Sequence, residues 1–274
     1  LFLKINLWIL LLSFAFAKQL SVDELNLACE KKDYGACHNL GLVYLNSGEI
    51  SLAKQYFEKA CSNKMSQSCF SLGLLYESGV GLEVDKFRAF EYFEKSCLSK
   101  EAIGCDKLAW YYEEGEAVRY DMAKALEIYD KNCKKQKGYK SCMRLGEIYS
   151  KGLEGVEKDG VKAIEYLDVA CEGKFEDSCE IISHLYFQGE ICDSEDENAT
   201  KKCVEKDINL AIKYLDKACN NGKSEACIEL GLEYLNGGVV DINTTISKEY
   251  FGKACDFKNE NGCKTYKMMI KEGM

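Results

Sequence analysis

The chain has 274 residues, 47% hydrophobic and 30% charged, which is ordinary for a folded soluble protein and long enough for a large buried core. Its formal net charge of −9 argues against a nucleic-acid phosphate backbone as a partner. The 16 cysteines predict disulfides in an oxidising compartment, and the absence of proline predicts helices joined by short turns.

The first 17 residues predict a secretory signal peptide. Lys4 supplies a positive start, residues 5–14 form an apolar run, and residues 15–17, Ala-Phe-Ala, match a cleavage site. The run is short for a membrane span, and charged sequence follows at once. We therefore expect cleavage after Ala17, no stable membrane span in the mature chain, and a secreted or periplasmic location. The alternative is an uncleaved membrane anchor.

The cysteines that follow form eight neighbouring pairs, six of them spaced C-x7-C. The first cysteines at positions 61, 97 and 133 are 36 residues apart, as are those at 219 and 255, and a fixed period of this size marks a repeat array. The longest step contains a 12-residue insertion, 192–203, for which we expect a solvated loop and not a calcium site. The predicted disulfides are Cys29–Cys37, Cys61–Cys69, Cys97–Cys105, Cys133–Cys142, Cys171–Cys179, Cys192–Cys203, Cys219–Cys227 and Cys255–Cys263.

Each repeat predicts two helices. In residues 69–76, Cys, Leu and Tyr recur at i, i+3 and i+7 on one face, and Gly79 ends the helix. A small residue after this Leu, such as Gly73, allows a neighbouring helix to approach closely. The second helix, within residues 85–100, carries an apolar stripe of Phe87, Phe90, Phe93 and Cys97. Acidic residues suit the start of this second helix in four units, at Asp85, Asp121, Asp159 and Asp207.

The paired cysteines are predicted to clamp successive repeats. The first cysteine closes the second helix of one unit, and the other lies in the opening turns of the next. A C-x7-C across such a turn can bring both Cβ atoms to bonding distance. The alternative, zinc ligation, needs clustered Cys and His with C-x2-C type spacing, and the chain has only two histidines and no such cluster. We expect no metal and no cofactor.

The combined pattern resembles a known repeat. A/C-x-x-L-G-x-x-Y-x-x-G followed by D-x-x-K/R-A-x-x-Y-F/L-x-K-A-C is similar to the Sel-one-like repeat, a relative of the tetratricopeptide repeat. With paired cysteines behind a secretory signal, the chain resembles the Helicobacter cysteine-rich protein family over residues 23–270. The sequence departs from this pattern in the C-x8-C spacing of Cys133 and Cys142, in the inserted pair, and at Ile182-Ser183 in place of Leu-Gly.

The resemblance implies an all-α fold, a right-handed α/α superhelical solenoid with a concave groove. Residues 18–274 would form one solenoid of about six full helix-pair repeats with terminal capping helices, behind the signal peptide at 1–17. Family members are described as secreted, host-facing or peptide-binding scaffolds, and as penicillin-binding proteins or β-lactamases. Both functions are therefore expectations for this chain.

The β-lactamase expectation finds little support among the residues. A serine enzyme of this kind needs S-x-x-K together with S-D-N and K-T-G, and only Ser51 and Lys54 fit the first motif. A cap at a helix start for Ser51 and a solvated side chain for Lys54 are the favoured explanation of this pair. A metallo-enzyme would need a histidine-rich zinc site, which His38 and His184 alone cannot form. The catalytic residues therefore remain unidentified.

A binding array is the favoured function. Solenoids present the first helix of each unit along one continuous face, which suits an extended peptide. The expected partner is a peptide or protein of the host or cell envelope, with a β-lactam or peptidoglycan fragment as the alternative. An acidic groove would favour a basic segment, and Trp110 is the best single anchor. The groove positions transferred from tetratricopeptide helices are His38, Asn46, Asp106, Trp110, Glu113, Glu114, Met143, Glu147, Glu180, His184 and Asn236.

Overall fold

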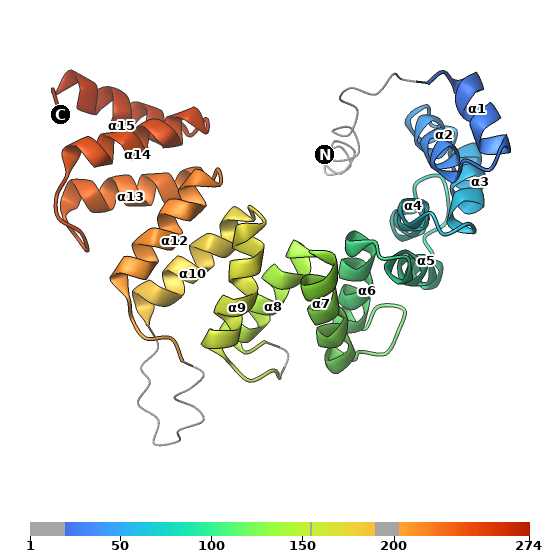
Figure 1. Ribbon diagram of the computed structural model, residues 1–274, viewed down its shortest axis with the longest axis horizontal. Helices are drawn as coiled ribbons and strands as arrows, with labels where there is room; N and C mark the ends of the chain where they lie inside the picture. The colour runs from blue at the N-terminus through green and yellow to red at the C-terminus, as the bar shows by residue number, and fades with distance from the viewer. Residues whose placement is uncertain (1–19, 154, 190–202) are drawn as a thin grey trace. The chain divides into compact units, whose positions relative to one another are not determined.

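The computed structural model describes residues 20–153, 155–189 and 203–274, and every regular element in these ranges is an α-helix (Figure 1). The predicted signal peptide and the Cys192–Cys203 pair lie outside the described residues. The helices divide into two compact units, Leu1–Gly104 and Cys105–Met274, which are considered separately. None of the helices within the described ranges is long and apolar enough to span a lipid bilayer.

Unit 1 consists mainly of two helix pairs that follow a short first helix. Within it α2 packs against α3 and α4 against α5, while α1 packs on α2. Its core contains Leu40, Phe57 and Leu72, each fully buried. The helices are α1 (Val22–Glu30), α2 (Tyr34–Asn46), α3 (Ile50–Cys61), α4 (Ser66–Ser78) and α5 (Lys86–Leu98).

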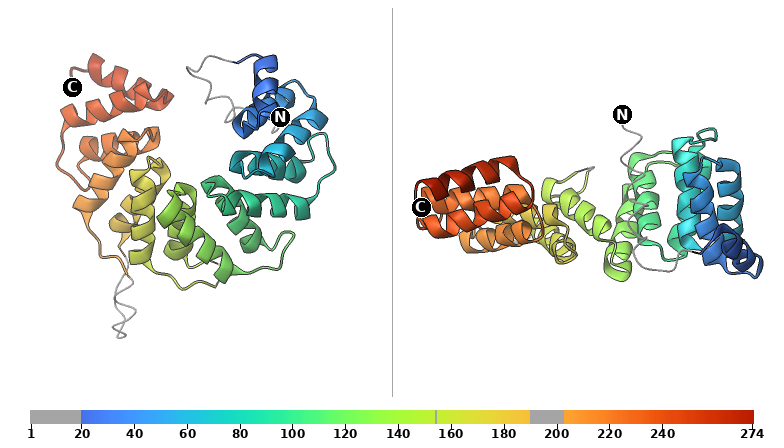
Figure 2. Two further views of the ribbon diagram at one scale, coloured as in Figure 1. Left: turned by 45° about the vertical axis from the view of Figure 1, so that its right-hand side comes forward. Right: turned by 90° about the horizontal axis from the view of Figure 1, so that it is seen from above.

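Unit 2 repeats the same arrangement of helix pairs (Figure 2). In it α8 packs against α9, α10 against α12 and α13 against α14, and α15 closes the series on α14. The helices are α6 (Ala102–Glu114), whose first residues belong to unit 1, α7 (Met122–Gln136), α8 (Tyr139–Lys151), α9 (Gly160–Glu172), α10 (Glu176–Gln188), α12 (Ile208–Asn220), α13 (Ser224–Asn236), α14 (Thr244–Asp256) and α15 (Glu260–Lys271). The fold is an all-α solenoid, as predicted.

The predicted acidic starts of the second helices are N-caps. In each of four second helices, an aspartate side chain accepts a hydrogen bond from the backbone N–H three residues along, which satisfies a donor that the helix itself leaves free. Asn243 does the same for α14. The four aspartates are Asp85, Asp121, Asp159 and Asp207.

Close helix pairing depends on small residues in the first helix of each pair. A Cβ placed on Gly73 would lie 2.5 Å from the ring of Phe93, and one on Gly146 would overlap Leu167. Ser183 stands at this position in α10, where the sequence departs from the repeat. Its buried Oγ donates a hydrogen bond of 2.8 Å to the carbonyl oxygen of Ala211 in α12, so the close pairing is kept.

One expected member of the core stripe is on the surface. Phe87 is 69% exposed, whereas Phe93 is fully buried. Because α5 begins at Lys86, Phe87 lies in its first turn. Ala89 and Phe93 share the buried face, and Phe87, two residues before Ala89, points away from it.

Disulfides join the second helix of one repeat to the first helix of the next. The bridged Cα atoms are 4.4 to 4.9 Å apart, and most of the cysteines are buried. Cys97, Cys105 and Cys203 are disulfide-bonded as well. Such a set indicates an oxidising compartment. Bridges in the described residues include Cys29–Cys37, Cys61–Cys69, Cys133–Cys142, Cys171–Cys179, Cys219–Cys227 and Cys255–Cys263.

A series of tyrosine–aspartate hydrogen bonds runs along the second helices of unit 2. The hydroxyl of Tyr214 in α12 donates a bond of 3.0 Å to Asp168 in α9, and that of Tyr250 in α14 donates one of 2.7 Å to Asp216 in α12. Each tyrosine lies five residues before the first cysteine of a pair, and each aspartate three before it. The repeat therefore encodes a contact between successive second helices that the sequence analysis did not anticipate.

Candidate functional site

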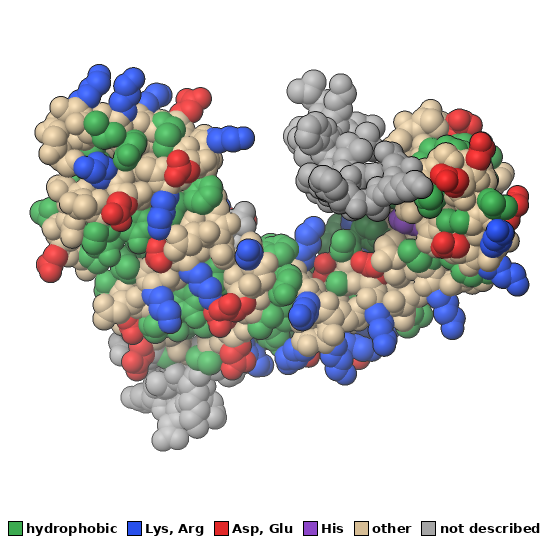
Figure 3. Space-filling model, turned by 45° about the horizontal axis from the view of Figure 1, so that its top comes forward, with side chains coloured by type: hydrophobic (Ala, Val, Ile, Leu, Met, Phe, Trp, Pro, Cys, Tyr) green, Lys and Arg blue, Asp and Glu red, His purple; other side chains and the backbone are tan. Residues whose placement is uncertain are grey.

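The candidate site is the row of first helices in unit 2, α6, α8, α10 and α13, which we call the first-helix face. Polar side chains of one first helix there contact side chains of the next. Figure 3 shows one side of the whole molecule, on which acidic and basic side chains lie among hydrophobic ones. Three clusters account for most of the predicted groove residues in this unit.

The first cluster contains Asp106 of α6. Its Oδ1 accepts a hydrogen bond of 2.8 Å from Asn132 Nδ2 in α7 and another from Ser141 Oγ in α8. Asn132 and Ser141 are fully buried, and burial raises the pKa of Asp106. Since its carboxyl oxygen holds three helices together, Asp106 is a structural group and not an exposed ligand contact.

The second cluster surrounds Glu113, whose side chain is 2% exposed. Arg144 Nε donates a hydrogen bond of 2.9 Å to Glu113 Oε1, and the Tyr129 hydroxyl donates one of 2.8 Å to Oε2. Arg144 also pairs with Glu147 Oε2 at 3.0 Å. Its hydrogen bond with Glu113 raises the pKa of Arg144 further. The buried carboxylate is fully compensated, and Glu147 and the outer part of Arg144 remain accessible.

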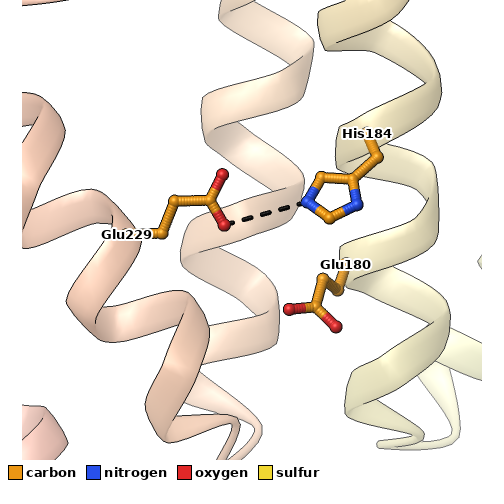
Figure 4. A group of neighbouring side chains, drawn as sticks. All are labelled: Glu180, His184 and Glu229. Carbon is orange, nitrogen blue, oxygen red and sulfur yellow. Dashed lines mark ion pairs between the residues drawn. The ribbon is translucent and has the colours of Figure 1, made fainter.

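The third cluster joins α10 to α13 (Figure 4). Glu180 and His184 lie on α10, and Glu229 lies on α13 with Oε2 3.8 Å from His184 Nε2. The interaction with Glu229 raises the pKa of His184. Lys223 Nζ lies 3.4 Å from Glu180 Oε2 and 2.5 Å from Asp177 Oδ1. His184 and Glu229 are 49% and 38% exposed, so this cluster is open to solvent.

The remaining predicted groove residues have separate surroundings. Trp110 is half-buried, and its indole ring makes an edge-to-face contact with the ring of Tyr111, with 5.3 Å between the ring centroids. Met143 packs into the core of unit 2. Glu114 and Asn236 are exposed. His38 and Asn46 belong to unit 1, where Asn46 is exposed, His38 Nδ1 lies 2.9 Å from Ser68 Oγ, and burial lowers the pKa of His38 to about 4.

The Ser51–Lys54 pair does not resemble an activated nucleophile. Ser51 is an exposed residue inside α3, whose N-cap is Glu49, so the alternative explanation of Ser51 as a cap is wrong as well. Lys54 Nζ lies 3.3 Å from Glu58 Oε1, and a hydrogen bond to Glu58 raises the pKa of Lys54. A lysine that acts as a base must be neutral, so this environment opposes that role.

Two residues of the site were missed from sequence. Arg144 and Glu229 each lie two positions after the second cysteine of a pair, and both reach back to the preceding first helix. Alignment of the repeats on that cysteine would have revealed the position. A further register, five residues after the same cysteine, is at least partly exposed in all four of these first helices; we call it the variable row, and it consists of Trp110, Glu147, His184 and Leu232.

Comparison with known proteins identifies the repeats. The sequence profile of the Sel1 repeat matches residues 35–65, 66–100, 102–135, 140–175, 201–223 and 224–256, as predicted. No curated protein matches the chain.

Solved structures share the fold at low sequence identity. A protective antigen of uropathogenic Escherichia coli, c5321, is 21% identical with a TM-score of 0.72; the match covers 93% of this chain and 52% of that protein, about half its length. A Sel1 repeat protein from Oxalobacter formigenes is 22% identical with a TM-score of 0.62, covering 84% and 88% of the two chains. Helicobacter pylori cysteine rich protein B also matches, at 23% identity and a TM-score of 0.34, covering 44% and 97%.

Proposed function

Because the chain belongs to the Sel1 repeat family, we propose that it binds an extended segment of a partner protein along the first-helix face of unit 2. Proteins built from these repeats generally bind other proteins. Stacked repeats also suit such a ligand, since each repeat offers one contact at a regular spacing.

The variable row is the observation that carries this proposal. Its position is at least partly exposed in every first helix of unit 2, yet its chemistry changes each time: Trp110, Glu147, His184 and Leu232. The residue immediately before each member of the row is small, as at Gly146 and Gly231. The second helix of the same pair packs directly against that residue. A constant frame with one changing outward residue per repeat is how an array can recognise a sequence of side chains.

Charge favours a basic segment with an apolar anchor. Glu114, Glu147 and Glu229 are at least partly exposed on this face. Arg144 is shared between Glu147 and the buried Glu113, and Lys223 is shared between Asp177 and Glu180, so carboxylates outnumber cations in these clusters. Trp110 and Leu232 supply apolar contacts at two points of the row, and aromatic residues are frequent anchors at interfaces. A lysine- or arginine-containing peptide with a hydrophobic residue fits this composition.

Selection of random linear peptides displayed on phage tests the proposal. Oxidised full-length protein is expected to select peptides enriched in Lys and Arg, whose binding weakens with salt because exposed charges are screened. Trp110→Ala and Leu232→Ala should each weaken the selected peptides by roughly tenfold, typical of an interface anchor. Phe87→Ala, which removes an exposed aromatic residue of unit 1, serves as the matched control and should leave binding unchanged. Failure to select any peptide, or equal loss in all three variants, would refute it.

The proposal includes a secreted or periplasmic location. The disulfides support it because they require an oxidising compartment, and residues 1–17 fit a signal peptide by sequence. Fractionation of cells that express the full sequence should recover a shortened chain beginning at Lys18 outside the cytoplasm. Recovery of the uncut chain in the cytoplasm would contradict this part of the proposal.

A further inference from the structure

We propose that Glu180, His184 and Glu229 form a binding site for a single zinc ion or a chemically similar transition-metal dication. Nothing in this inference depends on the partner segment proposed above. The sequence alone predicts no metal site, because the chain lacks clustered Cys and His and the three ligands here come from successive repeats.

The positions of the three side chains suit one metal ion. Glu180 and His184 are four residues apart on α10, which places both on one helix face, and Glu229 comes from α13 of the next repeat. One ligand atom from each of the three residues can be chosen so that all lie within 4.8 Å of one another. In a tetrahedral zinc site with bonds of about 2.0 Å, the ligand atoms are about 3.3 Å apart. The 3.8 Å between His184 Nε2 and Glu229 Oε2 is close to that value, and both side chains are exposed enough to rotate.

The ligand types favour zinc over calcium or magnesium. Imidazole nitrogen and carboxylate oxygen are both zinc ligands in proteins, whereas calcium and magnesium prefer oxygen ligands alone. Two carboxylates also balance the charge of a dication. Three protein ligands leave a coordination position open for water or another ligand.

A lysine already occupies part of this space. Lys223 Nζ lies 3.4 Å from Glu180 Oε2, but it lies closer to Asp177, at 2.5 Å from Oδ1. A bound dication would replace Lys223 at Glu180, and Lys223 would keep Asp177. Removal of the lysine side chain should therefore strengthen metal binding.

Other imidazole and thiol ligands are few in this chain. The whole sequence contains only two histidines, and His38 lies in unit 1 beside Phe57, with Nδ1 against Ser68. The described part of the chain has no free cysteine. An imidazole signal from bound zinc can therefore be assigned to His184 by comparison with His38 alone.

The test uses oxidised full-length protein without a polyhistidine tag. Zinc chloride is titrated by calorimetry, and the imidazole nitrogens of the two histidines are followed by NMR. We expect one zinc ion per chain, a large shift of the His184 resonances and little change in those of His38. His184→Ala and Glu229→Gln should each lower the affinity about tenfold or more, and Lys223→Ala should raise it.

Glu225→Gln is the matched control, since it removes an exposed carboxylate from the same helix as Glu229, one turn away, and should leave affinity unchanged. Magnesium chloride should produce no shift of His184. The proposal is overturned if zinc leaves the His184 resonances in place, or if His184→Ala binds zinc as tightly as the unmodified chain.

Discussion

Arg144 in α8 donates a hydrogen bond of 2.9 Å from Nε to Oε1 of Glu113, a carboxylate of α6 that is almost completely removed from solvent. The same guanidinium reaches Glu147 on its exposed side. One arginine thus compensates a buried charge between two repeats and also takes part in the surface proposed to bind a partner.

Arg144→Ala is expected to destabilise the protein by about 3 kcal/mol, because it leaves a buried carboxylate with only the Tyr129 hydroxyl. Chemical denaturation gives the loss in the free energy of unfolding. Lys151→Ala, at an exposed position of the same helix, should change it little. If Glu113→Gln together with Arg144→Ala is no more stable than Arg144→Ala alone, the unpaired charge is not the cause.

The stability of unit 1 should fall in mild acid because of His38. Burial lowers the pKa of His38 from 6.5 to about 4, so the folded chain stays neutral there while the unfolded chain binds a proton. This contribution is present above about pH 6.5 and is lost as the pH falls toward about 4. Unfolding midpoints measured across this interval should decline less steeply for His38→Gln. A titration of His38 by NMR that centres near 6.5 would contradict the argument.

Two glycines inside helices should respond oppositely to alanine. At Gly146 a Cβ would overlap Leu167 of α9, so Gly146→Ala should destabilise by about 1–3 kcal/mol through overpacking. At Gly252 the nearest atom would be in ordinary contact at 3.4 Å, so Gly252→Ala should stabilise α14 by about 0.5–1 kcal/mol. Thermal unfolding of both variants measures the difference. Equal effects would show that helix pairing tolerates a side chain at Gly146.

The tyrosine–aspartate contacts should be visible at alkaline pH. Burial, followed by the hydrogen bond to Asp168, raises the pKa of Tyr214 to about 12. The folded chain keeps this proton above about pH 10, where an unfolded tyrosine loses it, so the contribution is present below about pH 10 and is lost as the pH rises through 12. Asp168→Asn should lower the pKa of Tyr214, measured from its ring resonance by NMR. Asp256→Asn, an exposed carboxylate of α14, should leave it unchanged.

The sequence allowed the repeat, its helix starts and its disulfide pairing to be predicted because each is encoded within about 36 residues. Asp85, for example, caps the helix that it precedes, and Gly73 allows close packing of α4 against α5 of the same helix pair. The functions of Arg144 and Glu229 could not be seen in this way, because their partners lie one repeat earlier and depend on how successive first helices are aligned. Phe87 was misplaced because two three-residue steps back from Phe93 turn about 120° around the helix, which takes Phe87 off the face that buries Ala89 and Phe93.

The short span of the bridges has a consequence for biogenesis. Each of the six joins two cysteines that are only eight or nine positions apart. A chain that emerges amino end first from a translocation pore would expose both members of a bridge almost together, before the next pair appears. Nearest-neighbour oxidation would then give the native connectivity in order of emergence, and the protein would need a thiol oxidase but no isomerase to correct wrong pairings.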